Sequence, residues 1–439
     1  MDCRKNLFYL VVGIIILTAC QQPQPSRENS TENATGSVIF IHPDGSGANM
    51  WQAMRLLKVG PDGITNWDKM DHMGLYRSHQ KDCITTSSHA GATVHAFGVK
   101  VPYETYGIHP DRPIKSLSGK DYSIMIEAQK AGLKTALINS GHICEPGTGV
   151  FVANSDNRNN TDTISEQIIR SGVDILLSGG EIYLLPEGMV GVHGKPGKRK
   201  DGKNLIVIAV ELGYNVVYTK EEMEKLPLTT TKVLGVFAAK HTFNDMPEEE
   251  LNGQNLPFYN PEAPTIAEMT SFALRLFENS GKNFLLVVEE EGSDNFANEN
   301  NALGALKALS RADDAIGVAM QFTDKHPNTL LITAADSDAG GLQVGTFGND
   351  LIPDQPLPAT NQNGAPADGQ NGTGSLPFKA KTDQFGNELQ FAITWATDQD
   401  VYGAVIAKAH GLNAVKLPNN VDNTAIYKLI YLSLFGVEL

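Results

Sequence analysis

Four short apolar runs along the chain read as β-strands, and each is followed by a side chain that can bind a metal ion or act as a nucleophile. In chain order, the runs and the side chains are 38–41 with Asp44, 84–86 with Ser88, 284–288 with Glu289, and 329–332 with Asp336. In an open parallel α/β sheet, ligands collect beyond the carboxyl ends of the strands. Three carboxylates and a serine at that edge therefore predict one metal-assisted site.

Amphipathic helical patterns alternate with these runs. The predicted helices are 122–131, 163–171, 265–279 and 302–325. Gly132 and Gly281 follow two of them and Pro327 follows a third, as expected where helices stop. Alternating helices and strands predict the α/β class with a largely parallel sheet.

Residues 345–386 break this alternation. They are dense in Pro, Gly, Asn and Asp and have almost no apolar period. A loop of this length is usually either functional or mobile. We therefore predict a long surface insertion in an otherwise regular domain.

The N-terminus reads as a targeting segment. Two basic residues precede the apolar run 7–17, which is too short to span a bilayer and leads into Leu17-Thr18-Ala19-Cys20. This ending resembles a bacterial lipobox, whose cysteine becomes the lipidated first residue. We predict a signal peptide over 1–19, a lipid anchor at Cys20 and a flexible tether over 20–36. An uncleaved N-terminal anchor is the alternative.

The remaining body, residues 37–439, is predicted to be exported to the cell envelope in either case. The formal net charge of −15 argues against nucleic acid as a partner. This net charge does not exclude a small anionic substrate, because a local site can be positive on an acidic protein. The length fits one large α/β enzyme domain with insertions, or two domains.

The cysteines and the oligomeric state stay open at this point. Cys83 and Cys144 could pair in an oxidising compartment or remain two free thiols. A homodimer is compatible with the sequence, which does not require one.

Ser88 stands at the start of a predicted helix that closes at Gly98. Free N–H groups and the positive dipole end at a helix N-terminus suit an alkoxide and a phosphate group. The alternative is that Ser87 or Ser88 only caps the helix.

Two motifs resemble a known family. Pro43-Asp44-Gly45-Ser46-Gly47 is similar to the first metal-ligand loop of the alkaline phosphatases, and Thr86-Ser87-Ser88-His89-Ala90-Gly91-Ala92-Thr93 lies where their nucleophilic serine motif lies. The resemblance covers 38–342 and, more loosely, 385–415. It implies a three-layer α/β sandwich with a large, mostly parallel central sheet flanked by helices.

The resemblance also implies a reaction. The family consists of two-metal phosphomonoesterases that work through a covalent phosphoserine, and two metals about 4 Å apart can clamp the entering and leaving oxygens. A serine nucleophile splits hydrolysis into two displacements. Carried onto this chain, the nucleophile is Ser88, and Arg158 is the arginine that grips two phosphate oxygens.

Matching positions also imply a set of metal ligands. Asp44 and Asp336 would share one metal beside Ser88, and Asp44 and Glu289 would share a magnesium site. Asp294 falls at the spacing of a carboxylate on the other catalytic metal. Glu145 falls at the third magnesium ligand, although Gly147 stands where a threonine is usual.

Three histidines that complete the family's zinc sites are missing. Their positions hold Asn298, Ser337 and the neighbourhood of Ala396, while the carboxylates survive. Imidazole suits zinc, whereas oxygen ligands suit Mg²⁺, Ca²⁺ or Mn²⁺. We therefore predict a site refitted for hard cations, with Mg²⁺ in one position and Zn²⁺, Ca²⁺ or Mn²⁺ unresolved in the others. Asn298 would offer a carbonyl oxygen and Ser337 a hydroxyl.

The sequence also allows other metal ligands and other functions. Asp338, Asp398 or Asp400 could supply a missing oxygen ligand, and His42, His89 or His142 a nitrogen ligand or simple packing. A related enzyme acting on a phosphodiester or a sulfate ester is one rival reading. A degenerate surface protein that binds phosphate or cations without turnover is the other.

Overall fold

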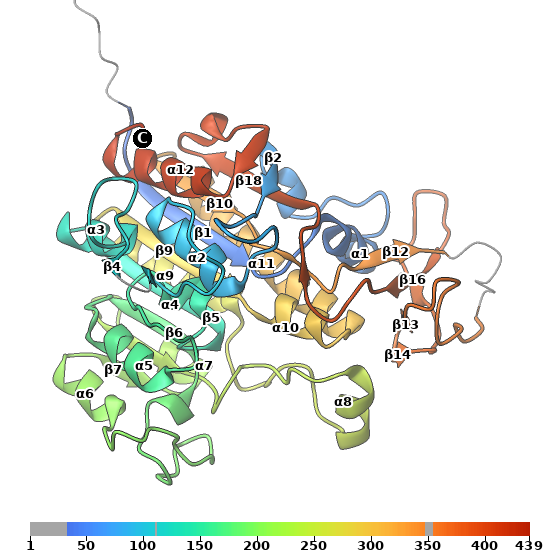
Figure 1. The fold of residues 1–439 in the computed structure, drawn as a ribbon, viewed down its shortest axis with the longest axis horizontal. Coiled ribbons are helices and arrows are strands. Elements are labelled where there is room, and N and C mark those ends of the chain that lie inside the picture. The colour runs from blue at the N-terminus through green and yellow to red at the C-terminus, as the bar shows by residue number, and fades with distance from the viewer. Residues whose placement is uncertain (1–32, 110–111, 347–353) are drawn as a thin grey trace, which may run out of the picture. The chain divides into compact units, whose positions relative to one another are not determined.

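A ten-stranded sheet is the centre of the computed structural model, which describes residues 33–109, 112–346 and 354–439 (Figure 1). The predicted signal peptide, Cys20 and most of the predicted tether lie outside these residues. Asn33–Leu439 form a single compact unit. Within the described ranges, none of the helices combines the length and the apolar character needed to cross a membrane.

The sheet is mostly parallel, as predicted. Its order is β19 (Asn420–Asp422), β2 (His72–Arg77), β18 (Val405–Gly411), β10 (Thr329–Thr333), β1 (Ser37–Pro43), β9 (Phe284–Glu290), β5 (Lys134–His142), β6 (Ile175–Gly179), β8 (Val233–Val236) and β7 (Asn215–Val217). Among these strands, β18 alone runs against its neighbours. β1 lies between β9 and β10, so the carboxyl ends of these three strands meet at one edge.

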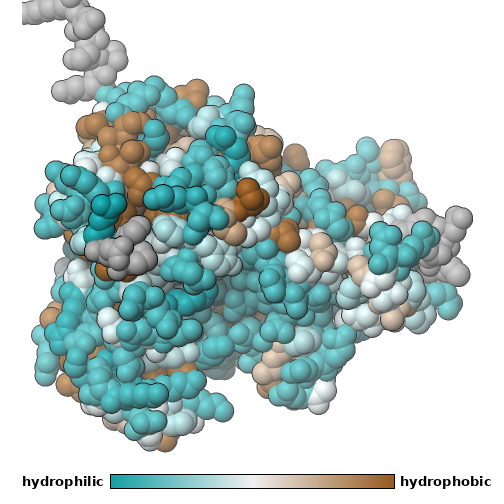
Figure 2. Space-filling model, in the orientation of Figure 1, coloured by the Kyte–Doolittle hydropathy of each residue, from teal (hydrophilic) through white to brown (hydrophobic). Residues whose placement is uncertain are grey.

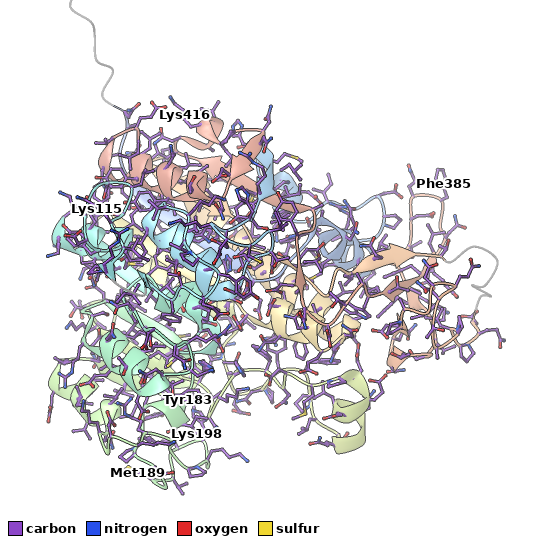
Figure 3. All side chains as sticks on the ribbon, viewed as in Figure 1. Lys115, Tyr183, Met189, Lys198, Phe385 and Lys416 are labelled. Atoms are coloured by element: carbon purple, nitrogen blue, oxygen red, sulfur yellow. The ribbon has the colours of Figure 1, made fainter. Side chains whose placement is uncertain are left out.

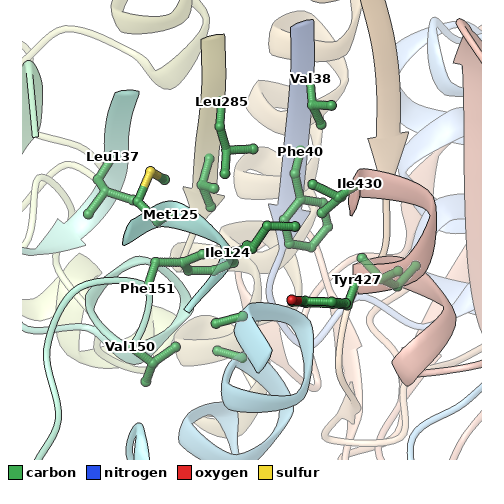
Figure 4. Close-up of a cluster of buried hydrophobic side chains, with 14 of the residues drawn as sticks. Val38, Phe40, Ile124, Met125, Leu137, Val150, Phe151, Leu285, Tyr427 and Ile430 are labelled. Atoms are coloured by element: carbon green, nitrogen blue, oxygen red, sulfur yellow. The ribbon is translucent and has the colours of Figure 1, made fainter. Parts of the chain in front are cut away.

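Both faces of the central strands β1, β9 and β10 are buried, which explains the continuous apolar runs of the sequence. In β1, Val38 and Phe40 join one core, while Ile39 and Ile41 join the core on the opposite face. Figure 4 shows the first of these cores, where Phe40 lies near Ile124 and Tyr427. Successive side chains of a strand point to opposite faces, so such a strand has no polar side.

Helices cover each face and complete the predicted three-layer sandwich. The first core includes residues of α2 (Ser88–Phe97), α3 (Ile124–Lys130), α5 (Thr161–Arg170), α6 (Leu205–Glu211) and α12 (Thr424–Phe435). The second includes residues of α1 (Ala48–Lys58), α7 (Lys220–Glu224), α8 (Glu248–Gln254), α9 (Ile266–Ser280), α10 (Gly292–Asn298) and α11 (Ala302–Lys325). A short helix, α4 (Pro146–Gly149), follows β5.

One predicted strand is wrong. Residues 84–86 form no strand, because Ile84, the apolar residue of the run, is 67% exposed and does not join the core. The segment instead leads into α2, which begins at Ser88 as predicted. Cys83 and Cys144 are both free thiols, which settles the open choice between a disulfide and two unpaired cysteines.

The region predicted as an insertion contains regular structure in its described part. It contributes to a small second sheet made of β12 (Gln343–Gly345), β16 (Gln390–Thr394), β13 (Ala367–Gly369), β14 (Gly372–Thr373) and β15 (Phe378–Lys379). Two strand pairs complete the structure, β11 (Asp338–Ala339) with β17 (Asp400–Val401) and β3 (Ile108–His109) with β4 (Arg112–Pro113). Trp395 anchors the small sheet by donating to Asp368 at 2.6 Å. The face of the molecule in Figure 2 is mostly hydrophilic, with scattered apolar residues.

Candidate active site

The side chains predicted from the strand ends come together at the edge formed by β1, β9 and β10. Asp44 follows β1, Glu289 is the next-to-last residue of β9, and Asp336 follows β10; all three are 0% exposed. Glu290, between Glu289 and Glu291, accepts from Ser140 at 2.8 Å and from Tyr259 at 2.7 Å. Glu290 therefore braces the end of β9 from behind, and its neighbours face the site.

Asp44 is shared between two groups of metal-ligating atoms. In one group, ligand atoms of His42, Asp44 and Glu289 lie within 4.8 Å of one another. In the other, atoms of Asp44, Glu291 and Asp294 lie equally close. Glu291 is 3% exposed and belongs to the second group.

Ser88 lies at the start of α2, close to Asp336. Ser87 is the capping residue, because its hydroxyl accepts from the Ala90 N–H at 3.3 Å. The Ser88 hydroxyl makes no hydrogen bond to any described residue, and the side chain is 7% exposed. A Cβ on Gly91 would lie 2.5 Å from the Asp336 Cβ, so the glycine lets the first turn of α2 approach Asp336 closely.

The cluster contains many buried oxygen atoms without a hydrogen-bond partner in the described residues. They are Asp44 Oδ2, Glu289 Oε1, Glu291 Oε2, Asp294 Oδ1, Asn298 Oδ1, both carboxylate oxygens of Asp336, and Ser337 Oγ. Two like charges 4 Å apart repel by about 4 kcal/mol at an effective dielectric constant of about 20. Buried charges are normally paired or bound to metals. The residues present therefore fit divalent cations.

Burial sets the protonation of this cluster. It raises the pKa of Glu289, Glu291, Asp294 and Asp336 well above the usual range, and the neighbouring carboxylates raise these pKa values further. Burial also raises the pKa of Asp44, but the contact of 3.1 Å with His42 outweighs it and the pKa lies below the usual range. Bound cations reverse such upward shifts because they favour the carboxylate form.

Arg158 borders the cluster on the side of Ser88. Its guanidinium lies 3.6 Å from Glu145 Oε2 and 3.5 Å from His89 Nδ1, and its side chain remains 40% exposed. Burial lowers the pKa of Arg158, but Glu145, Glu291 and Asp294 outweigh it and raise that pKa. A half-exposed arginine held between a carboxylate and the Ser88 segment can grip an incoming anion.

Side chains with a buried, unpartnered oxygen atom stand at two of the three missing histidine positions. Asn298 donates to Asp294 Oδ2 at 3.1 Å and to Asp400 at 3.4 Å, which leaves its carbonyl oxygen free and buried. Ser337 is 1% exposed, directly after Asp336. At the third position Ala396 is exposed and offers no ligand.

Three further aspartates are possible oxygen ligands by their positions in the sequence. Asp400 contacts Asn298 and joins the cluster, and Asp338 is 6% exposed with one oxygen lacking a partner among the described residues. Burial and Asp400 raise the pKa of Asp338 to about 7. Asp398 is exposed and contacts Thr397, so the structure gives it no place in the cluster.

The sequence reading missed His241. His142, Glu145 and His241 have ligand atoms within 4.8 Å of one another. His241 follows β8 by five residues at the same edge of the sheet, so the strand-end rule that located Asp44 would also have pointed to it. His89 contacts Ser87 and Arg158 and borders Ser88 rather than the carboxylates.

Sequence comparisons agree with this geometry. Residues 36–402 match the model of the protein family described as alkaline phosphatase. Alkaline phosphatase 4 of Bacillus subtilis (strain 168) is 26% identical over 353 residues, which are 77% of this chain and 69% of that protein. The repressible alkaline phosphatase of Saccharomyces cerevisiae is 25% identical over 353 residues, which are 75% of this chain and 59% of that protein.

Solved structures share the fold. Thermus thermophilus alkaline phosphatase superposes with a TM-score of 0.69 at 22% identity, covering 92% of both chains. Alkaline phosphatase from the Antarctic bacterium TAB5 gives 0.68 at 19% identity, covering 92% of this chain and 100% of that one. A histidine-to-glutamate mutant of the TAB5 enzyme, with Mg bound in its M3 site, gives 0.68 at 21% identity and covers 92% and 99%. The predicted fold is confirmed.

Proposed function

Because the chain belongs to the alkaline phosphatase family, we propose that it hydrolyses phosphate monoesters through a covalent phosphoserine on Ser88. The observation that carries this proposal is the free hydroxyl of Ser88 at the start of α2, packed beside a buried carboxylate cluster. A binding scaffold has no need of an unbonded serine at this place.

The residues divide the work of two displacements. The Ser88 oxygen attacks phosphorus, the bond from phosphorus to the leaving alcohol oxygen breaks, and the serine proton ends on that alcohol. Water then attacks the phosphoserine, which releases inorganic phosphate and restores the Ser88 hydroxyl. Arg158 holds non-bridging oxygens by two parallel hydrogen bonds through both steps.

The site fits hard divalent cations, with Mg²⁺ as the first choice and Zn²⁺, Ca²⁺ or Mn²⁺ in a further position. When bound, the cations would stabilise the negative charge on the entering and leaving oxygens. Their ligands would come from Asp44, Glu145, Glu289, Glu291, Asp294, Asn298, Asp336 and Ser337. The glutamate at position 145 has a parallel in the TAB5 mutant, in which a histidine-to-glutamate change accompanies Mg in the M3 site.

Trapping the intermediate tests the proposal. The protein is mixed with an aryl phosphate, quenched in acid and digested, and the peptide containing Ser88 is examined by mass spectrometry. We expect phosphate on Ser88, and none in the Ser88→Ala variant. Turnover without any phosphorylated peptide, or an unchanged label in the variant, contradicts the assignment.

A second candidate is a protein that binds phosphate or cations without turnover. The observation that favours it is the absence of nitrogen ligands at Asn298, Ser337 and Ala396. A related activity on phosphodiesters or sulfate esters is compatible with the same scaffold. A substrate panel on the purified protein distinguishes all three. A monoesterase hydrolyses an aryl phosphate faster than a phosphodiester or a sulfate ester, a related enzyme prefers one of those two esters, and a binding protein hydrolyses none of them.

We also propose export and lipid anchoring through Cys20. The support is the sequence Leu17-Thr18-Ala19-Cys20 after a short apolar run. Mass spectrometry of the mature N-terminus is expected to show a diacylated cysteine that the Cys20→Ala variant lacks. An unmodified, uncleaved N-terminus would instead indicate the simple anchor.

A further inference from the structure

A pair of histidines and a glutamate form a buried cluster beside the carboxylate site. His142 ends β5, Glu145 follows it by three residues, and His241 comes from the loop after β8. The side chains of Glu145 and His241 are 6% and 3% exposed, and the two imidazole rings stack at 4.9 Å. These residues lie outside the positions that the family resemblance assigns to zinc.

The contacts of His241 point to a missing cation. Its Nδ1 lies 3.7 Å from Glu145 Oε1, is fully buried, and has no hydrogen-bond partner in the described residues. A separation of 3.7 Å is too long for a hydrogen bond. It is close to the roughly 3.4 Å between two ligand atoms that bind one tetrahedral metal ion at about 2.1 Å each.

The other nitrogen of His241 faces a carboxylate. Nε2 lies 3.6 Å from Asp245 Oδ2, which also contacts Lys240 at 3.2 Å. Histidines that bind metals usually direct their second ring nitrogen at a carboxylate, which fixes the tautomer. At 3.6 Å this contact is electrostatic and not a hydrogen bond, but the negative charge of Asp245 favours the proton on Nε2. The Nδ1 lone pair is then directed at Glu145, where two electron-rich atoms meet without a proton between them.

From this geometry we propose that His142, Glu145 and His241 bind a transition-metal ion of the zinc class. Two imidazoles and one carboxylate are a set that such ions take with an open fourth position. The proposal does not depend on phosphatase turnover. It adds a nitrogen-rich site next to the oxygen-rich cluster and places Glu145 between the two.

His142 is the ligand that costs most to recruit. Its Nε2 donates to Glu145 Oε1 at 2.8 Å, and its Nδ1 accepts from the Cys144 N–H at 3.2 Å. Metal binding at Nε2 displaces that proton and breaks the contact with Cys144. We therefore expect removal of His241 to weaken metal binding more than removal of His142.

A cleft gives the ion a path from solvent. It has a volume of about 620 Å³ and is lined by His241, Lys240 and Asp245 on one side and by Ile182 and Lys198 on the other. Figure 2 shows the surface hollowed between the part containing α5 and α7 and the part containing α8. Figure 3 labels Lys198 beside Tyr183, whose ring packs against His142 at 4.6 Å. Water from this cleft can complete the coordination.

Cobalt titration tests the site directly. The protein is stripped with chelator, saturated with Mg²⁺ to fill the oxygen-rich cluster, and titrated with Co²⁺, whose visible absorption is strong in four-coordinate nitrogen-containing sites. We expect one equivalent with strong absorption in the unmodified protein. His241→Gln should abolish the absorption, and His326→Gln, which changes a histidine remote from the cluster, should leave it unchanged.

Asp245→Asn is the second variant, because it keeps all three ligands and removes only the carboxylate that faces His241. It should weaken Co²⁺ binding about 10–100-fold. Circular dichroism of the stripped proteins verifies that each variant is folded. Strong absorption that persists in His241→Gln overturns the proposal. Its absence from the unmodified protein at millimolar Co²⁺ also overturns it, whatever the phosphatase activity is.

Discussion

The carboxylate of Glu289 fills the space that a side chain on Gly147 would need. A Cβ at position 147 would lie 1.7 Å from Glu289 Oε1. The family resemblance makes a threonine usual at this position. Gly147 therefore leaves room for the Glu289 carboxylate at the place where any side chain would meet it.

Gly147→Ala should disable the site while the protein remains folded. The added methyl group must displace Glu289, and misplacement of a catalytic group by about 1 Å can cost on the order of 10²-fold in rate. We expect that loss in kcat for an aryl phosphate. Gly253→Ala in α8 is the control, since no atom lies within 4 Å of its new Cβ; it should retain full activity. Equal activity in both variants would contradict the tight packing at Gly147.

Ser87 and Ser88 should respond to alanine substitution in opposite ways. Ser88→Ala removes the nucleophile and should lower kcat by on the order of 10³-fold or more with little change in stability. Ser87→Ala removes the helix cap and should lower the free energy of unfolding by about 1 kcal/mol while phosphorylation of Ser88 persists. Urea unfolding and phosphopeptide analysis measure the two effects, and the reverse pattern would exchange the two roles.

Arg158 should act by gripping phosphate. Arg158→Ala is expected to lower kcat/KM on the order of 10²-fold, as loss of one preorganised donor typically does. Arg158→Lys keeps the charge but not the planar fork, so it should recover only part of the loss. Inhibition by inorganic phosphate should weaken in parallel. An unchanged inhibition constant in Arg158→Ala would remove this role.

Glu248 should make stability depend on pH. This residue is 2% exposed, and burial reinforced by Asp368 raises its pKa from 4.5 to about 8. Between these values the folded protein holds a proton that the unfolded chain has released, so the free energy of unfolding falls as pH rises. The fall reaches at most about 1.4 kcal/mol per pH unit.

Glu248→Gln should remove that dependence. Urea unfolding of both proteins from pH 5 to pH 8 is expected to show the variant gaining stability relative to the unmodified protein as pH rises. Glu250→Gln changes an exposed residue of the same helix and serves as the control. A stability difference that stays constant over this range would place the titration of Glu248 outside it.

Much of the fold could be predicted because the buried sheet imposes a simple pattern. β1, β9 and β10 have apolar residues on both faces, and Asp44, Glu289 and Asp336 lie at their ends on one edge of the sheet, as the strand pattern predicts. The strand predicted over 84–86 was wrong because three residues with one exposed isoleucine cannot be distinguished from a loop by their pattern alone. The small second sheet was missed because its strands of two to five residues show no period.

The site was predictable where strand ends define it and less so elsewhere. Glu291 follows the end of β9 and precedes α10, and its place beside Asp44 and Asp294 depends on that turn and not on the alternation of a strand. The end of β8 indicates the edge at which His241 lies, but nothing local to it indicates Glu145 as its partner, because several helices and strands separate the two residues in the chain and tertiary packing brings them together. The contact between Gly91 and Asp336 likewise joins segments far apart in the chain.

The most direct test of the account is phosphatase activity resolved by metal. The protein is stripped with chelator and assayed on an aryl phosphate with Zn²⁺, Mg²⁺, Ca²⁺ or Mn²⁺ added singly and in pairs. The account predicts that Mg²⁺, Ca²⁺ or Mn²⁺ restores turnover and that Zn²⁺ alone does not, because oxygen ligands dominate the cluster around Asp44. A folded protein without turnover in any metal, or one restored by Zn²⁺ alone, would contradict it.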